Sequence, residues 1–331
     1  MTDPVRSRRA RAVVFAYHNV GVHCLYSLLA HDVEVALVVT HPDDPNENQW
    51  FASVGELAKE HHLPVLYVED AQSAQLRAQI LAIAPDFIFS FYFRRMLPTA
   101  LLALATRGAL NMHGALLPKY RGRAPVNWAV IHGETETGAT LHYMTAKPDA
   151  GDIVGQERVT ILPDETAGEV FDKVTFAAQA LMQRVLPDLL KGTAQAQAQD
   201  LSQGSYFGGR RPEDGQIDWS ADAHTIHNLV RGVAPPYPGA FTEVRGLHLR
   251  VLRTRLEPQS SPATDAPALY VQGDACFVDC LQGGRLRLLD LEIDGKSANA
   301  AQFALRFGSE RIALGSAPTD KANTIPSFIQ T

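Results

Sequence analysis

Short apolar runs alternate with amphipathic runs over residues 12–143, and no other feature of the chain constrains its fold as strongly. The runs at 13–16 (VVFA) and 35–39 (VALVV) are apolar at every position, as expected for strands that helices cover on both faces. The amphipathic runs between them have helical spacing. We therefore expect an α/β fold built on an open, mostly parallel, Rossmann-like sheet. In chain order, the expected elements are strand 12–17, helix 21–30, strand 33–40, helix 53–61, strand 65–68, helix 73–83 and strand 87–91.

The remainder of the chain divides by composition. Thr166 and Glu169 have the spacing of a capping box, and the helix that they open should end near Gly192. The next stretch, TAQAQAQDLSQGS at 193–205, has few large apolar residues and is typical of a surface connector. Short strand-like runs follow it, which predicts a smaller, mostly β, open-barrel-like (OB-like) domain. The predicted boundaries are a flexible arm 1–11, a first domain 12–192, a linker 193–207, a second domain 208–316 and a tail 317–331, with a flexible stretch at 257–264.

Charge, cysteine content and hydropathy argue against several kinds of partner and site. The 331 residues include 30 Lys plus Arg against 36 Asp plus Glu, a net charge of -6, so no global positive field attracts a nucleic acid. The three cysteines lack the spacing of a disulfide framework or a zinc site, and we expect no bound metal. No apolar run approaches the roughly 20 residues that span a bilayer, so we expect no membrane segment and a cytoplasmic location.

The loop after the first strand lacks the common phosphate-binding signatures. The run HNVGV at 18–22 contains a single glycine, whereas a dinucleotide site needs several. No GxxxxGK[ST] motif occurs either. Ligands of open α/β sheets still bind beyond the carboxyl ends of the strands, so the other loops at that edge are the place to look for chemistry.

Three of those segments carry suitable polar residues. Asn111 and His113 lie two positions apart at the end of a strand-like run, so their side chains should project from one face. The run LLPKYRGRAP at 116–125 combines cations with glycine and prolines, and Asp149 lies in the turn-like run TAKPDAGD at 145–152. Taken singly, each has a simpler explanation: local loop hydrogen bonds, a solvated basic loop and a turn-forming aspartate.

Taken together, these segments resemble the formyltetrahydrofolate-dependent formyltransferases. The resemblance rests on Asn111-x-His113, LLPKYRG at 116–122, GETETGATLH at 133–142 and DAGD at 149–152. It extends over roughly residues 12–255. It implies the formyltransferase fold and an N-formyltransferase activity.

Within the family, two runs are most similar to the formyltransferases of UDP-4-amino-4-deoxy-L-arabinose: RGRAPVNWAVIHGETETG at 121–138 and FAYHN at 15–19. This implies formyl transfer to the 4-amine of that sugar, in the aminoarabinose modification of lipid A that leads to polymyxin resistance. The activity commonly occurs as the first half of a bifunctional protein with a decarboxylase half. Because the chain ends at residue 331, we expect formyl transfer alone.

The resemblance also implies the site residues, with 10-formyltetrahydrofolate as co-substrate and Asn111, His113 and Asp149 as the catalytic set. An amide N–H and an imidazolium can stabilise the negative oxygen that forms when an amine attacks the formyl carbon. A side chain that titrates near neutrality can move the proton between the two nitrogens, and the carboxylate should raise the pKa of the imidazole and orient it. The implied folate-binding residues are Arg95, Met96, Leu97, Arg123, Thr145, Ala146, Lys147, Pro148 and Asp149.

Alternatives to this function remain open at the level of the sequence. The same catalytic set would serve another nucleotide-linked amino sugar or methionyl-tRNA, although the acidic net charge argues against tRNA. A non-catalytic module that binds folate or a nucleotide sugar would have no need of Asn, His and Asp together. The expected partners are therefore a nucleotide-linked amino sugar and folate, and the oligomeric state is left open.

Overall fold

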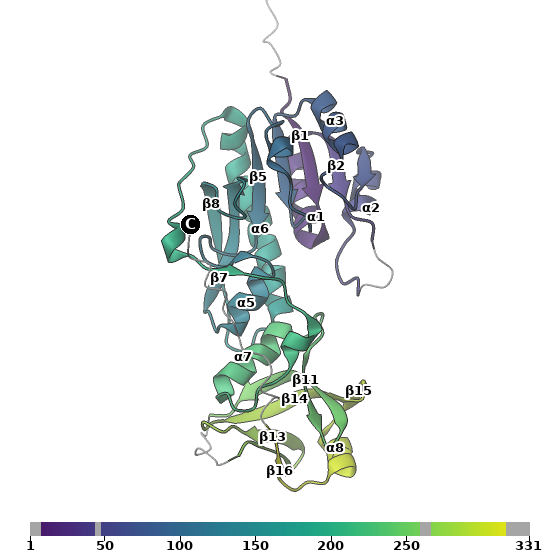
Figure 1. The fold of residues 1–331 in the computed structure, drawn as a ribbon, viewed down its shortest axis with the longest axis vertical. Helices are drawn as coiled ribbons and strands as arrows, with labels where there is room; N and C mark the ends of the chain where they lie inside the picture. Colours follow the sequence, from purple (N-terminus) through teal and green to yellow (C-terminus); the bar gives the residue numbers. More distant parts are fainter. Residues whose placement is uncertain (1–7, 44–47, 259–265, 316–331) are drawn as a thin grey trace, which may run out of the picture. The chain divides into compact units, whose positions relative to one another are not determined.

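The computed structural model describes residues 8–43, 48–258 and 266–315 (Figure 1). Two compact units make up the chain. Unit 1 consists of Met1–Ala129 and Glu134–Arg210, and unit 2 consists of Val130–Gly133 and Arg211–Thr331.

Some of the predicted flexible regions fall outside these residues. The tail at 317–331 and most of the stretch at 257–264 are not among the described residues. Of the predicted arm, Arg8 and Arg9 form ion pairs of 2.8 Å with Asp86 and Asp32. The next structural element, the first strand, starts at Arg11.

Unit 1 contains a seven-stranded sheet with the order β3-β2-β1-β4-β5-β7-β8 (Figure 1). The first five strands in that order run parallel, and the last two are antiparallel to their neighbours. The predicted open, mostly parallel α/β sheet is confirmed. Its strands are β1 (Arg11–Ala16), β2 (Glu34–Thr40), β3 (Val65–Tyr67), β4 (Phe87–Phe91), β5 (Gly108–His113), β7 (Glu136–Tyr143) and β8 (Ile153–Thr160).

Apolar side chains on both faces of the central strands explain why helices cover this sheet. Leu76 and Ile80 of α3 (Ala74–Ile83) pack in one buried cluster with Val13 and Phe15 of β1. Val14 lies between those two residues, is also fully buried, and points to the opposite face. The other helices that contain unit 1 residues are α1 (His18–Ala30), α2 (Val54–Glu60), α4 (Thr99–Leu102), α5 (Pro125–Ile131) and α6 (Ala167–Lys191).

The long helix α6 begins at the predicted capping box. Glu169 donates its backbone N–H to Thr166 Oγ1 at 3.3 Å, and a Glu169 carboxylate oxygen accepts from the Thr166 N–H at 2.7 Å. The helix ends at Lys191, and its C-cap Gly192 has a left-handed φ of 74°. Its apolar side packs on α1, β7 and β8.

The segment that follows α6 returns to the sheet of unit 1. Gln197 forms a bridge to Ile153 at the start of β8. Farther along, β9 (Tyr206–Phe207) pairs in parallel with β6 (Arg121–Gly122). The residues predicted as a linker, 193–207, thus belong to unit 1 in the structure.

Unit 2 contains an antiparallel sheet with the order β10-β11-β14-β13-β12-β16, and β15 pairs with β14. The predicted smaller, mostly β fold is confirmed. Trp219 and Phe303 are among the fully buried side chains of its core. Its helices are α7 (Ala223–Val233) and α8 (Ala300–Phe307), and its strands are β10 (Ala240–Val244), β11 (Leu247–Leu256), β12 (Ala268–Gln272), β13 (Ala275–Asp279), β14 (Arg285–Ile293), β15 (Lys296–Ala298) and β16 (Ile312–Ala313).

Candidate active site

Asn111 and His113 lie at the carboxyl end of β5, and a neighbouring strand brings a second histidine beside them. Asn111 is paired with His142 of β7 across the antiparallel ladder. Directly opposed residues of two strands have side chains on the same face, and Asn111 Nδ2 lies 3.2 Å from His142 Nε2. The structure therefore places an amide and two imidazoles at one edge of the sheet.

Asp149 completes this cluster from the loop between β7 and β8. Its Oδ2 lies 3.6 Å from His113 Nδ1, and its Oδ1 lies 3.5 Å from both His142 Nε2 and Asn111 Nδ2. The backbone N–H of Gly122 donates to Oδ2 at 2.9 Å. The three predicted catalytic residues are thus close together, with one carboxylate facing both histidines.

Backbone carbonyls determine which ring nitrogens carry a proton. His113 Nε2 lies 2.7 Å from the carbonyl oxygen of Tyr120, and His142 Nδ1 lies 2.9 Å from that of Tyr143. A carbonyl only accepts, so each of these nitrogens must donate. In the neutral rings, His113 Nδ1 and His142 Nε2 are therefore the acceptors, and Asn111 donates to the latter.

Burial sets the charge states of the cluster. Burial lowers the pKa of His113 below the ordinary histidine value, and Asp149 and the Tyr120 carbonyl offset this only in part. Burial would raise the pKa of Asp149, but the charge of His113 in its protonated form, the contact with His142 and the Gly122 N–H outweigh it and hold that pKa well below its usual range. Asp149 does raise the pKa of His113, as expected, but desolvation of the fully buried ring is the larger effect and the net shift is downward. At neutral pH, His113 is neutral and Asp149 is ionised.

The loop after β5 supplies the Tyr120 carbonyl and the Gly122 N–H. Side chains of β7 and β8 hold the first residues of this loop. Thr140 donates its hydroxyl to the Ala115 carbonyl at 2.6 Å and accepts from the Leu117 N–H at 3.2 Å. Gln156 donates to the Leu117 carbonyl at 2.9 Å. Thr140 is fully buried, so these contacts give the loop a defined start.

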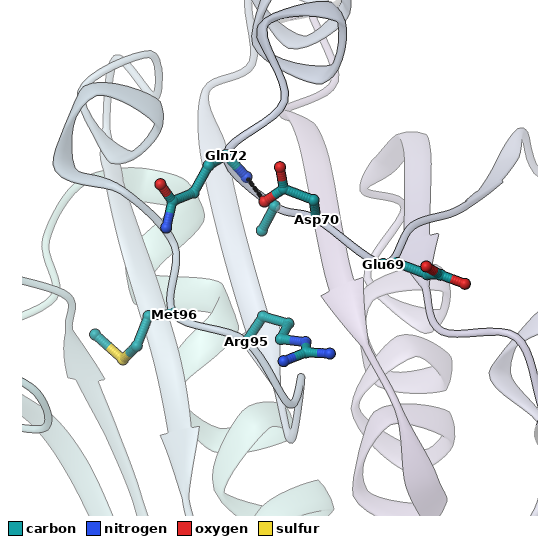
Figure 2. A pocket seen from close by; sticks show the side chains of 6 residues that line it. Glu69, Asp70, Gln72, Arg95 and Met96 are labelled. Atoms are coloured by element: carbon teal, nitrogen blue, oxygen red, sulfur yellow. Dashed lines mark hydrogen bonds between the residues drawn. The ribbon is translucent and has the colours of Figure 1, made fainter.

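The residues predicted to bind folate fall into two groups. Arg95 and Met96 follow β4 and line a cavity of about 420 Å³ together with Glu69, Asp70, Ala71 and Gln72 of the loop after β3 (Figure 2). Met96 is 60% exposed, whereas Leu97 packs in the buried cluster beneath. The cavity thus lies at the carboxyl ends of parallel strands, where open α/β sheets bind ligands.

The other predicted folate residues do not line that cavity. Thr145, Ala146 and Lys147 are exposed, and Thr145 donates to the Lys147 carbonyl at 3.0 Å. Pro148 is half-buried beside Asp149. Arg123 is exposed, and its guanidinium lies 3.5 Å from the carbonyl oxygen of Arg94.

Sequence reasoning did not assign a role to His142. The residue lies within the run at 133–142 that carried the resemblance, but its place beside Asn111 depends on the antiparallel register of β5 and β7.

Within the described residues, no group of three or more His, Cys, Asp or Glu side chains is arranged to hold a metal ion. No helix of the described part of the chain is long and apolar enough to cross a membrane.

Solved structures with this fold include several formyltransferases. An N-formyltransferase from Helicobacter canadensis, in complex with folinic acid and dTDP-3-aminofucose, is 18% identical over 85% of this chain and 99% of its own, with a TM-score of 0.65. The sugar 3N-formyl transferase WlaRD, solved with dTDP and 5-N-formyl-THF, is 15% identical over 85% of this chain and 98% of its own, with a TM-score of 0.68. HypX from Aquifex aeolicus, in complex with tetrahydrofolic acid, is 17% identical over 90% of this chain and 47% of its own, with a TM-score of 0.58. At these identities the similarity establishes the fold.

Family models establish the relationship itself. The model of the formyl transferase family matches residues 15–186, which is more than half of the chain. The model of the formyl transferase C-terminal domain matches residues 210–308. The chain belongs to the formyl transferase family and is a formyltransferase enzyme.

Proposed function

We propose that this enzyme transfers the formyl group of 10-formyltetrahydrofolate to the 4-amine of UDP-4-amino-4-deoxy-L-arabinose. The observation that carries the proposal is the cluster of Asn111, His113 and Asp149 at one edge of the sheet, with distances of 3.5 and 3.6 Å to the shared carboxylate. This combination of side chains can supply both proton transfer and oxyanion stabilisation. In this role, the product serves the aminoarabinose modification of lipid A.

His113 is the proposed proton carrier. The amine nitrogen attacks the formyl carbon, and its proton passes to the unprotonated Nδ1 of the neutral His113 ring. When the bond between the formyl carbon and N10 of the folate breaks, the same proton passes to N10. The ionised Asp149 stabilises the imidazolium in between, since its Oδ2 lies 3.6 Å from His113 Nδ1.

Asn111 is the proposed oxyanion donor. One N–H of its amide is directed to His142 Nε2 at 3.2 Å, and the other approaches Asp149 at 3.5 Å. The second contact is at the limit of hydrogen-bond length. That N–H is therefore only weakly engaged and is available to the oxygen of the tetrahedral intermediate, where negative charge develops.

The proposed folate site combines the cavity at Arg95 and Met96 with Leu97, Arg123 and the segment 145–149. The cavity volume of about 420 Å³ suits part of a cofactor-sized ligand. The exposed Arg123 suits an anionic group of the folate. The neighbours solved with folinic acid, 5-N-formyl-THF and tetrahydrofolic acid support a folate co-substrate.

A nucleotide-linked amino sugar is the proposed acceptor class. The Helicobacter canadensis enzyme was solved with dTDP-3-aminofucose and WlaRD with dTDP. The runs at 15–19 and 121–138 favour the UDP-linked arabinose derivative within that class. A dTDP-linked amino sugar is the second candidate, because the catalytic cluster would act on either acceptor in the same way.

Tetrahydrofolate release, followed with 10-formyltetrahydrofolate and each acceptor in turn, tests the proposal. We expect turnover with UDP-4-amino-4-deoxy-L-arabinose and none with a panel of dTDP-amino sugars or methionyl-tRNA. His113→Ala should lower kcat by about 10²- to 10⁴-fold because the proton carrier is lost. The exposed His61 at the end of α2 provides the matched control, and His61→Ala should retain the wild-type kcat.

Two outcomes would contradict the proposal. Turnover with only a dTDP-amino sugar would keep the chemistry and replace the acceptor. An active His113→Ala variant would remove the mechanism.

A further inference from the structure

Ser205 contacts the loop after β5 on both sides of Tyr120. Its N–H donates to the Pro118 carbonyl at 3.3 Å, and its Oγ accepts from the Tyr120 N–H at 2.8 Å. Its own carbonyl accepts from the Arg121 N–H at 3.0 Å. One residue of the connecting segment thus holds three backbone groups of this loop, at Pro118, Tyr120 and Arg121.

The next two residues of the segment continue the contact as a strand pair. Phe207 is paired with Gly122 in the short parallel ladder of β9 and β6, and the Arg123 N–H donates to the Phe207 carbonyl at 3.0 Å. The backbones approach so closely that a Cβ at Gly122 would lie 2.1 Å from the Phe207 oxygen. A Cβ at Gly204 would lie 2.4 Å from the Pro118 oxygen. Glycine at both positions therefore makes this docking possible.

The loop held in this way carries two of the contacts that define the catalytic cluster. The Tyr120 carbonyl accepts from His113 Nε2, and the Gly122 N–H donates to Asp149 Oδ2. Both groups belong to the backbone, so only the conformation of the loop places them. That conformation is braced by Ser205 and β9.

Gln199 braces the other side of the cluster. Its Nε2 donates to the backbone carbonyls of Asp149 and Gly151 at 3.1 and 2.6 Å. Two carbonyl acceptors identify the nitrogen end of this amide. Its buried Oε1 has no hydrogen-bond partner among the described residues, so the side chain is positioned by its donor end alone.

We propose that Ser205 and Gln199 are positioning residues of the active site, and that the segment 199–207 is a brace for the catalytic cluster rather than a passive connector. Ser205 holds the loop that fixes the tautomer of His113 and the charge of Asp149. Gln199 holds the backbone from which the Asp149 side chain projects. The inference rests on the catalytic roles proposed above, and neither residue needs to touch substrate.

The kinetic test compares matched variants of the full chain. Ser205→Ala removes the hydroxyl acceptor and should lower kcat about tenfold, with both KM values within about twofold of wild type. Ser205→Thr keeps the hydroxyl and should recover most of the kcat. The control is Ser202→Ala, because the Ser202 hydroxyl donates only to Asp200 within the same segment.

Gln199→Met gives an independent measurement at the other side of the cluster. It keeps the length of the side chain and removes both donors, so we expect a similar loss of kcat. The control is Gln195→Met, because Gln195 donates to the local carbonyl of Thr193 and not to the Asp149 loop.

A measurement without substrate separates this inference from the proposed function. The His113 Nε2 proton, identified in the NMR spectrum by its loss in His113→Asn, should exchange with water at least about tenfold faster in Ser205→Ala than in wild type, because a loosened loop opens more often. If no acceptor is formylated by the wild type, the proposed function fails. The exchange rates still test whether Ser205 holds the loop in place. Wild-type exchange in Ser205→Ala would overturn the inference, as would equal kcat losses in Ser202→Ala and Ser205→Ala. If Ser205→Ala does not fold, the kcat of Gln199→Met decides in its place, and a wild-type value overturns the inference.

Discussion

At the scale of single residues, His142 connects the amide and the carboxylate of the proposed catalytic set. Its ring is 2% exposed, with Nδ1 donating to a backbone carbonyl and Nε2 accepting from Asn111. This arrangement leaves the Asn111 amide one N–H that is firmly held and one that is loosely held. His142 thus aims Asn111 without needing to contact the substrate.

Replacing His142 tests this role. His142→Phe keeps a planar ring but removes the acceptor for Asn111, so we expect kcat to fall by about 10- to 100-fold, the range found when groups that orient metal ligands are replaced. His142→Gln retains a polar group and should recover part of the loss. Steady-state kinetics are the measurement, with circular dichroism to verify folding, and a wild-type kcat in His142→Phe would refute the role.

At the scale of elements, the long helix α6 supports the strands that carry the cluster. It packs on β7, which holds His142, and on β8, which follows the Asp149 loop. Its capping box satisfies backbone N–H groups that would otherwise lack partners in the first turn. The cap lies at the helix terminus, so its contribution is to stability and not to the chemistry.

Thr166→Ala should therefore lower the free energy of unfolding by about 1 kcal/mol and leave kcat unchanged. Thr166→Ser keeps the hydroxyl that accepts from the Glu169 N–H and should retain most of the stability. Urea unfolding followed by far-UV circular dichroism gives the comparison. An unchanged unfolding midpoint in Thr166→Ala would show that the cap contributes nothing.

At the scale of the whole molecule, net charge separates the two classes of acceptor. The chain has a formal net charge of -6 at pH 7, whereas the binding of a polyanion such as tRNA depends on many contacts of Lys and Arg with phosphates. A small nucleotide sugar needs only a few local cations. The acidic balance therefore favours the sugar over methionyl-tRNA.

We accordingly expect no competition by initiator tRNA in the formyl transfer assay at about 0.15 M salt, near physiological ionic strength. Fluorescence anisotropy of labelled tRNA, at low and at moderate salt, measures binding directly. Tight binding that weakens steeply as salt is added would return methionyl-tRNA to consideration, because that dependence is the signature of phosphate contacts.

Local patterns in the sequence determined the sheet and the helix α6, and the resemblance to the formyltransferases supplied the identity of the clustered residues. The apolar runs predicted the parallel strands, and Thr166 and Glu169 predicted the start of α6, because both signals arise from neighbours in the chain. The spacing of Asn111 and His113 likewise placed them on one face of a strand. The tertiary structure alone decided the pairing of His142 with Asn111, the lowered pKa of His113 and the contacts of Ser205 and Gln199 with the catalytic loops. These depend on strand register, on burial and on backbone groups far apart in the chain, and a polar segment such as 193–207 contains no periodic signal of the loops that it will hold.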